Sequence, residues 1–220
     1  MRQANKKGDI IMTKLILTGF KAKFKIYDKE LKILRPIVEQ WLKINREYIE
    51  DYDYEDCLYA YNERSTISSF AGAVWRCGGY AQEEYIAVKG ENEKNGRIDL
   101  YFNFANKDVI VEAKQKFIKL IPNSKKNFEK HITDSFNDSI KDIGETQKAN
   151  NYGDLNLGIS FIVPLWKDGS DQKENLSKIK GIVQNLKPSM YVILQSKKSI
   201  VFNEETKTVS NIVILLCKKV

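Results

Sequence analysis

Two runs of sequence decide the predicted fold: Gly96-Arg97-Ile98-Asp99-Leu100 and Val109-Ile110-Val111-Glu112-Ala113-Lys114. The first run alternates apolar and polar residues and the second is β-branched, so both are expected to be strands. The short turn Ala105-Asn106-Lys107 between them favours antiparallel pairing. Glu112 and Lys114 are two residues apart and therefore project from one face of their strand. If the two strands pair, Asp99 converges with that face.

A helix is expected just before these strands. Asn62 or Ser65 can cap its start, and Gly78-Gly79 can end it. Glu63 lies four residues before Ile67, which belongs to the apolar stripe of the helix, so Glu63 projects on the buried face at the N-terminal end. A buried carboxylate needs a partner, because an unpaired buried charge is costly.

The side chains of Glu63, Asp99, Glu112 and Lys114 together predict metal-assisted hydrolysis. Carboxylate oxygens are the ligands that Mg²⁺ prefers, and substrate phosphate can complete its coordination shell. Bound Mg²⁺ polarises a phosphodiester and helps to generate hydroxide from water. Lys114 can hold the attacking water or offset negative charge that develops on phosphorus.

This pattern resembles a known superfamily of nucleases. Asp99 followed by Glu112-Ala113-Lys114 looks like the PD-(D/E)xK motif of restriction endonuclease-like folds, and the layout with Asn62-Glu63-Arg64 is most similar to archaeal Holliday-junction resolvases. The resemblance implies that Asp99 and Glu112 bind Mg²⁺ (or Mn²⁺), that Lys114 serves the water, and that Glu63 supports the metal or its water. It also implies cleavage of DNA. Ile98 replaces the proline of the motif name.

The rest of the chain predicts a single α/β domain with a mixed sheet. A long amphipathic helix from Phe128 to Ile143 precedes a buried strand from Leu157 to Leu165, which is the pattern of a crossover connection. We expect a restriction endonuclease-like core at about 62–165, of helix, three-strand meander, helix and strand. An N-terminal strand and helix (14–61) and a C-terminal helix with strands (172–220) are added to it. Those later strands are expected at 191–194, 199–202 and 212–216.

The charge balance suits a nucleic-acid partner. The 220 residues include 36 Lys and Arg against 29 Asp and Glu, a net charge of +7, which is a weak pointer to a polyanion. The lysines expected to meet the DNA backbone lie after the strand that carries Glu112 and Lys114 and at the start of the long helix: Lys116, Lys125, Lys126 and Lys130. Lys21, Lys23 and Lys25 form a second basic row, which either contacts DNA or only aids solubility.

Several kinds of site are excluded. His131 is the only histidine, so multi-histidine metal centres are impossible; it is expected at the surface, with a phosphate contact as the alternative. The three cysteines are far apart and form no CxxC, which argues against a zinc site or a disulfide framework and suits the reducing cytoplasm. No apolar run is long enough to span a bilayer, so no membrane partner is expected. Trp41 and Trp75 fall on apolar stripes and are expected in the core.

Three interpretations remain open. The leading one is a metal-dependent endodeoxyribonuclease that works in restriction, phage defence, mobile-element processing or recombination. The alternative is a non-catalytic module that binds nucleic acid or protein on the same fold. The third is an unrelated α/β protein in which Asp99 and Glu112 are far apart. A homodimer would suit the cutting of two strands, although no interface is visible in the sequence.

Overall fold

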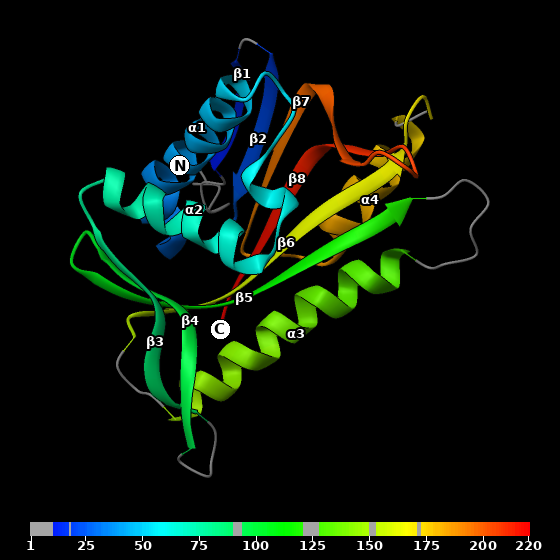
Figure 1. Cartoon of the computed structure of the whole chain (residues 1–220). Helices are drawn as coiled ribbons and strands as arrows, with labels where there is room; N and C mark the ends of the chain where they lie inside the picture. The colour runs from blue at the N-terminus through cyan, green and yellow to red at the C-terminus, as the bar shows by residue number, and fades with distance from the viewer. Residues whose placement is uncertain (1–10, 18, 90–93, 121–127, 150–152, 171–172) are drawn as a thin grey trace, which may run out of the picture.

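A single mixed sheet of eight strands organises the molecule (Figure 1). The computed structural model describes residues 11–17, 19–89, 94–120, 128–149, 153–170 and 173–220. The strand order is β1-β2-β7-β8-β6-β5-β4-β3, so the predicted α/β class with a mixed sheet is confirmed. The strands are β1 (Ile11–Leu17), β2 (Phe20–Ile26), β3 (Tyr80–Lys89), β4 (Lys94–Phe104), β5 (Lys107–Leu120), β6 (Leu155–Lys167), β7 (Met190–Asn203) and β8 (Thr208–Lys219).

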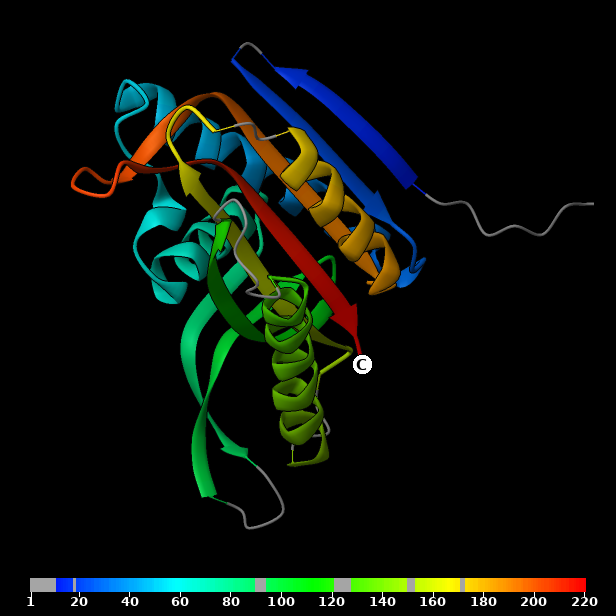
Figure 2. The same ribbon diagram turned by 90° about the vertical axis from the view of Figure 1, so that its right-hand side faces the viewer.

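Helices cover both faces of this sheet (Figure 2). Helices α1 and α2 pack on one face in the larger apolar core, whose members include Trp41 and Phe70, while α3 and α4 pack on the other with Ile132 and Ile179. None of the described helices is long and apolar enough to cross a membrane. The helices are η1 (Glu30–Leu34), α1 (Arg35–Asp51), η2 (Leu58–Ala60), α2 (Glu63–Arg76), α3 (Phe128–Ala149) and α4 (Lys173–Asn185).

The centre of the sheet follows the predicted order of elements. Strands β3, β4 and β5 form an antiparallel meander, and α3 then crosses over so that β6 pairs parallel to β5. Ala105 and Asn106 occupy the β4–β5 turn with positive φ angles of 53° and 58°, the backbone that a two-residue hairpin of matching twist requires. The expected additions at both ends of the chain extend this sheet, because β2 and β8 both pair with β7.

The structure corrects three expectations outside the centre. Strand β1 pairs with β2 and was not expected. The two late strands at 191–194 and 199–202 are one strand, β7, whose pairing with β8 shifts register between Gln195 and Ile200. Trp75 is wrongly predicted as core, because its side chain is 54% exposed and packs edge-on against Tyr80, with ring centroids 5.7 Å apart.

Candidate functional site

The candidate site begins where β4 parts from β5. The two strands pair from Phe104 and Lys107 up to Leu100 and Val111. Beyond this point, side chains bond to the β5 backbone on that edge. The N–H of Ala113 donates to Asp99 Oδ2 at 2.7 Å, and the N–H of Gln115 donates to Glu63 Oε2 at 2.7 Å. Alternate N–H groups of a strand point to the same side, so two carboxylates line one short stretch of edge.

The start of α2 fixes the position of Glu63. The side chain of Asn62 accepts a hydrogen bond of 2.9 Å from the N–H of Ser65, which confirms the predicted cap and makes Glu63 the first helical residue. Burial raises the pKa of Glu63, and the neighbouring charge of Asp99 acts in the same direction. The bond from Gln115 opposes this rise. Glu63 is therefore held where a carboxylate charge is unfavourable unless a cation is near.

Lys114 supplies a cation at this place. Its Nζ lies 2.5 Å from Asp142 Oδ2 on α3. Burial by itself would lower the pKa of Lys114, but the bond to Asp142 and the charges of Asp142, Glu63 and Asp99 outweigh burial and raise this pKa. We call Glu63, Asp99, Lys114 and Asp142 the charged cluster. It sets three carboxylates against one ammonium, so negative charge is in excess.

Glu112 lies beside the charged cluster but is directed at α3. Its side chain is 2% exposed, and its Oε1 accepts a hydrogen bond of 2.8 Å from Thr146 Oγ1. One more step of the β4–β5 ladder would set Asp99 opposite Glu112. Glu112 is thus adjacent in register to Asp99, and its role as a metal ligand stays a prediction.

Gly158 allows α3 to approach Glu112 closely. Gly158 is the β6 partner of Glu112 in the parallel ladder. A Cβ atom at this position would lie 2.8 Å from the backbone oxygen of Ser139 on α3, which is closer than real Cβ contacts allow. The missing side chain therefore lets the helix that carries Asp142 and Thr146 lie against the sheet.

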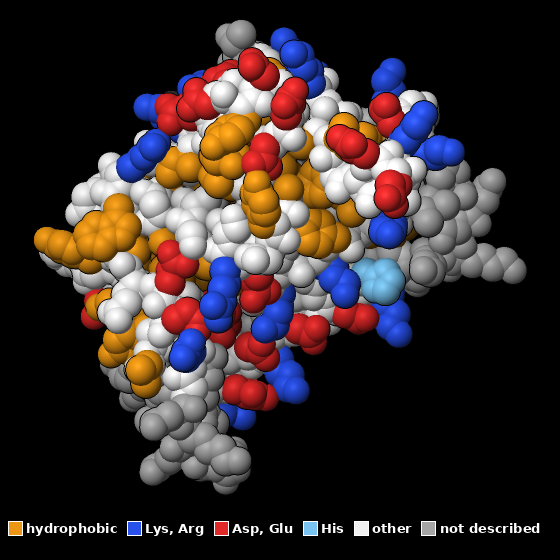
Figure 3. Space-filling view, in the orientation of Figure 1, with side chains coloured by type: hydrophobic (Ala, Val, Ile, Leu, Met, Phe, Trp, Pro, Cys, Tyr) orange, Lys and Arg blue, Asp and Glu red, His pale blue; other side chains and the backbone are white. Residues whose placement is uncertain are grey.

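A hollow of about 280 Å³ opens beside Lys114, between β5 and α3. Asp134 and Asp138 line it from α3, and Asp142 follows at the same four-residue spacing, so one helix face carries a row of acids. Figure 3 shows acidic and basic side chains interleaved on this side of the molecule. The other residues that line the hollow are Gln115, Lys116, His131 and Ser135.

Two of the four lysines predicted to meet DNA lie among the described residues. Lys116 is exposed at the hollow, and Lys130 is exposed in the first turn of α3. Lys125 and Lys126 lie outside the described residues. His131 is exposed, as expected, although it lines the hollow beside Lys116.

Asp142, Asp134 and Asp138 were missed by sequence reasoning. The available signal was their spacing of four residues along the predicted helix, which places them on one face. Thr146 continues the same spacing and was also missed. The side chain of Gln115 has a structural contact, because its Nε2 donates to the backbone oxygen of Tyr59 at 3.2 Å and ties β5 to the segment before α2.

The fit of the charged cluster to a divalent cation rests on its donors. Among the described residues, no three His, Cys, Asp or Glu side chains are arranged to hold a metal ion by themselves. Asp99 and Glu63 each bond to the backbone through one oxygen, and a carboxylate has two. Mg²⁺ is commonly bound by one or two carboxylates with water and phosphate oxygens completing the shell. The donors present suit that mode of binding.

The chain matches no protein-family model, no curated protein and no solved structure.

Proposed function

We propose that the protein is a divalent-cation-dependent nuclease that hydrolyses DNA phosphodiester bonds at the charged cluster. The observation that carries the proposal is the edge of β5, where Asp99 and Glu63 bind successive outward N–H groups next to Lys114. Carboxylate oxygens can bind a cation, and the ammonium of Lys114 beside them can bind a phosphate oxygen at the same time. Partial burial of Glu63, which raises its pKa, distinguishes this carboxyl from one in an exposed surface ion pair.

Each residue has a separate task in this proposal. Asp99 and Glu63 offer carboxylate oxygens to Mg²⁺ or Mn²⁺, with Glu112 as the adjacent third acid. The cation, when bound, polarises the phosphodiester and lowers the pKa of water. Lys114 donates hydrogen bonds to the attacking water or to a phosphate oxygen. Asp142 is a positioning residue, because its contact with Lys114 holds the ammonium at the β5 edge.

The DNA partner is supported by charge rather than by a groove of known shape. The chain carries a net charge of +7 although the charged cluster is acidic, so the positive charge lies elsewhere. Lys116 lines the hollow beside Lys114, and Lys130 directly precedes His131 of the same hollow, so both could meet backbone phosphates. Restriction, phage defence, mobile-element processing and recombination are the settings in which such an enzyme works, and a homodimer would allow both strands to be cut.

The decisive experiment is a cleavage panel. Purified protein is incubated with supercoiled plasmid, linear duplex, a four-way junction and single-stranded DNA, with Mg²⁺, with Mn²⁺ or with chelator. We expect metal-dependent nicking of at least one substrate, and loss of about a hundredfold or more in Asp99→Asn, which keeps an acceptor for the Ala113 N–H. Absence of cleavage on every substrate would refute the proposal.

A matched variant pair controls for general damage. Lys107, the first residue of β5, and Asp154, which directly precedes β6, form an ion pair of 3.0 Å. Lys107→Gln and Asp154→Asn change the same residue types but lie outside the charged cluster. Both are expected to cleave like the unmodified protein.

One observation favours a non-catalytic binding module as the second candidate. The ammonium of Lys114 is already engaged by Asp142, and the described residues hold no ready-made three-ligand metal group. A binding module would retain DNA in a salt-sensitive way without turnover. Calorimetry with Mn²⁺ separates the two candidates, because only the nuclease should take up the ion in a manner that Asp99→Asn abolishes.

A further inference from the structure

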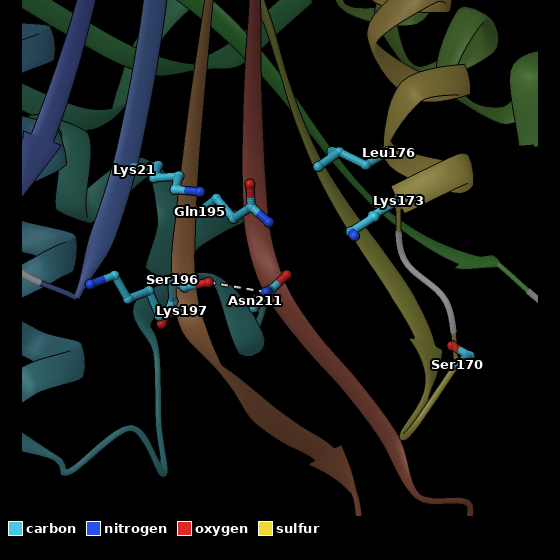
Figure 4. A pocket seen from close by; sticks show the side chains of 8 residues that line it. All are labelled: Lys21, Ser170, Lys173, Leu176, Gln195, Ser196, Lys197 and Asn211. Atoms are coloured by element: carbon cyan, nitrogen blue, oxygen red, sulfur yellow. Dashed lines mark hydrogen bonds between the residues drawn. The ribbon is translucent and has the colours of Figure 1, made fainter.

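A larger hollow lies away from the charged cluster, between α4 and the strands β2, β7 and β8 (Figure 4). Its volume is about 450 Å³. We call it the α4 hollow. Lys21 on β2 pairs in register with Gln195 on β7, and both side chains reach into the hollow. Lys173 reaches in from the first turn of α4 on the opposite side.

The lining of the α4 hollow is basic. Figure 4 shows the ammonium groups of Lys21 and Lys173 pointing inward from opposite sides of Gln195, whereas the ammonium of Lys197 points away. No acidic side chain is among the described residues that line it. On α4, the pKa of Lys180 is lowered by burial and by the charges of Lys23 and Lys21. Positive charge is therefore concentrated between α4 and β2.

The floor of the α4 hollow carries an unpartnered acceptor. Asn211 is only 5% exposed, and its Nδ2 donates to the backbone oxygen of Ser196 at 3.0 Å. This bond fixes the amide orientation, since the opposite orientation would set two oxygens against each other. Asn211 Oδ1 is buried and has no hydrogen-bond partner in the described part of the chain, and the same holds for Ser170 Oγ at the rim. Buried polar atoms normally have partners, so a donor is missing here.

We propose that the α4 hollow binds a phosphate group that carries a neighbouring N–H or O–H donor. Lys21 and Lys173 would bind the phosphate from two sides as point charges. The Gln195 amide would add a neutral donor, and Asn211 Oδ1 would accept from the ligand. A nucleotide and a nucleic-acid strand both present this chemistry. The site stands independently of the proposed nuclease, because none of these residues belongs to the charged cluster.

Binding measurements with defined probes test the site. The full chain is titrated with inorganic phosphate and with deoxyadenosine monophosphate by calorimetry, and with a fluorescein-labelled duplex by anisotropy at several salt concentrations. Lys21→Gln is compared with Lys29→Gln, which removes another exposed lysine outside the α4 hollow. Lys21→Gln should weaken binding of the phosphate-bearing probes by about tenfold, because it removes one charge-assisted contact. For the duplex, it should also reduce the slope of log affinity against log salt concentration by about one.

The outcomes separate the two sources of phosphate. Nucleotide binding that duplex does not displace identifies a small-molecule site. Duplex binding that is sensitive to Lys21→Gln, with no nucleotide binding, identifies a contact to the nucleic-acid backbone. Equal effects of Lys21→Gln and Lys29→Gln, or no binding of any probe, would overturn the proposal. With chelator present, Asp99→Asn should leave the affinities for inorganic phosphate and for deoxyadenosine monophosphate unchanged, because Asp99 does not line the α4 hollow. Loss of cleavage and loss of binding at the α4 hollow can therefore be told apart.

Discussion

Lys114 on β5 and Asp142 on α3 form an ion pair of 2.5 Å between Nζ and Oδ2. The pair joins the strand that carries the sequence motif to the helix that crosses over to β6. Both side chains are about one-third exposed, at 35% and 34%, so solvent weakens their attraction. The contact therefore matters more for the position and protonation of Lys114 than for the stability of the fold.

Substitution of Asp142 should change the pH profile of cleavage. In Asp142→Asn, Lys114 loses the partner that raises its pKa, so Lys114 becomes neutral at a lower pH than in the unmodified protein. We expect the alkaline limb of the cleavage rate to move to lower pH, while the free energy of unfolding falls by less than about 1 kcal/mol. Cleavage rates across the alkaline range and urea unfolding measure the two quantities. An unchanged alkaline limb would show that Asp142 does not act through Lys114.

Glu63 should make stability depend on pH in the opposite sense to an ordinary ion pair. Its pKa in the folded protein is raised above 4.5, so the folded state disfavours the ionised form. The contribution of Glu63 to folding is therefore lost as pH rises from 4.5 through the folded pKa. Glu63→Gln removes this dependence and should gain stability relative to the unmodified protein at neutral pH but not at acid pH.

Denaturant unfolding at acid and neutral pH measures this difference. Addition of Mn²⁺ should offset the neutral-pH penalty in the unmodified protein and have little effect on Glu63→Gln. A constant difference in stability at all pH values would mean that the Glu63 carboxylate does not titrate in the way that its surroundings predict.

Substitutions at the contact between Glu112 and Thr146 distinguish an effect on the stability of the fold from an effect on cleavage. Thr146→Val removes a hydroxyl that donates to a buried carboxylate at 2.8 Å and should cost about 1–3 kcal/mol of unfolding free energy. Thr146→Ser keeps the hydroxyl and should cost less. Glu112→Gln keeps an acceptor for Thr146 and should fold, yet lose metal-dependent cleavage if Glu112 is a ligand. Full cleavage by Glu112→Gln would remove Glu112 from the proposed metal site.

Two glycines make a matched test of how closely α3 packs. Gly158→Ala places a Cβ 2.8 Å from Ser139 O and should cost about 1–3 kcal/mol. Gly144 lies within α3, and a Cβ added there would meet no described atom within 4 Å beyond its own helix backbone. Gly144→Ala should therefore stabilise the protein by up to about 1 kcal/mol. Thermal unfolding of both variants gives the direction in which each substitution changes the melting temperature. Similar shifts for the two variants would show that α3 does not pack closely against Gly158.

The centre of the fold follows from local patterns in the sequence. The Asn62 cap, the short turn before β5 and the crossover from α3 to β6 are set by capping, turn and periodicity rules. The convergence of Asp99 with β5 follows too, because a hairpin joins β4 to β5 and the two bonded residues are 14 apart in sequence. Glu63 and its partner Gln115 are 52 apart, so the sequence predicts only the inward direction of Glu63 on α2, and the packing of α2 on the sheet supplies the contact.

Other parts depend on tertiary packing. The contact of Asp142 with Lys114 requires the rotation of α3 about its own axis, which periodicity leaves undetermined within a wide apolar stripe. Trp75 lies at the border of the α2 stripe, where about 100° of helical rotation separates it from buried Val74. The polar run from Gln195 to Ser199 resembles a turn, yet β7 continues through it because β8 accommodates the irregular pairing.

The parting of β4 from β5 has a consequence for how this site can change over evolutionary time. Asp99 and Glu63 cap backbone N–H groups that a neighbouring strand would otherwise satisfy. A descendant without the proposed cleavage would still require acceptors at both positions, so Asn, Gln or Ser would be tolerated there and apolar side chains would not. Such a descendant would keep recognisable polar residues at positions 63 and 99.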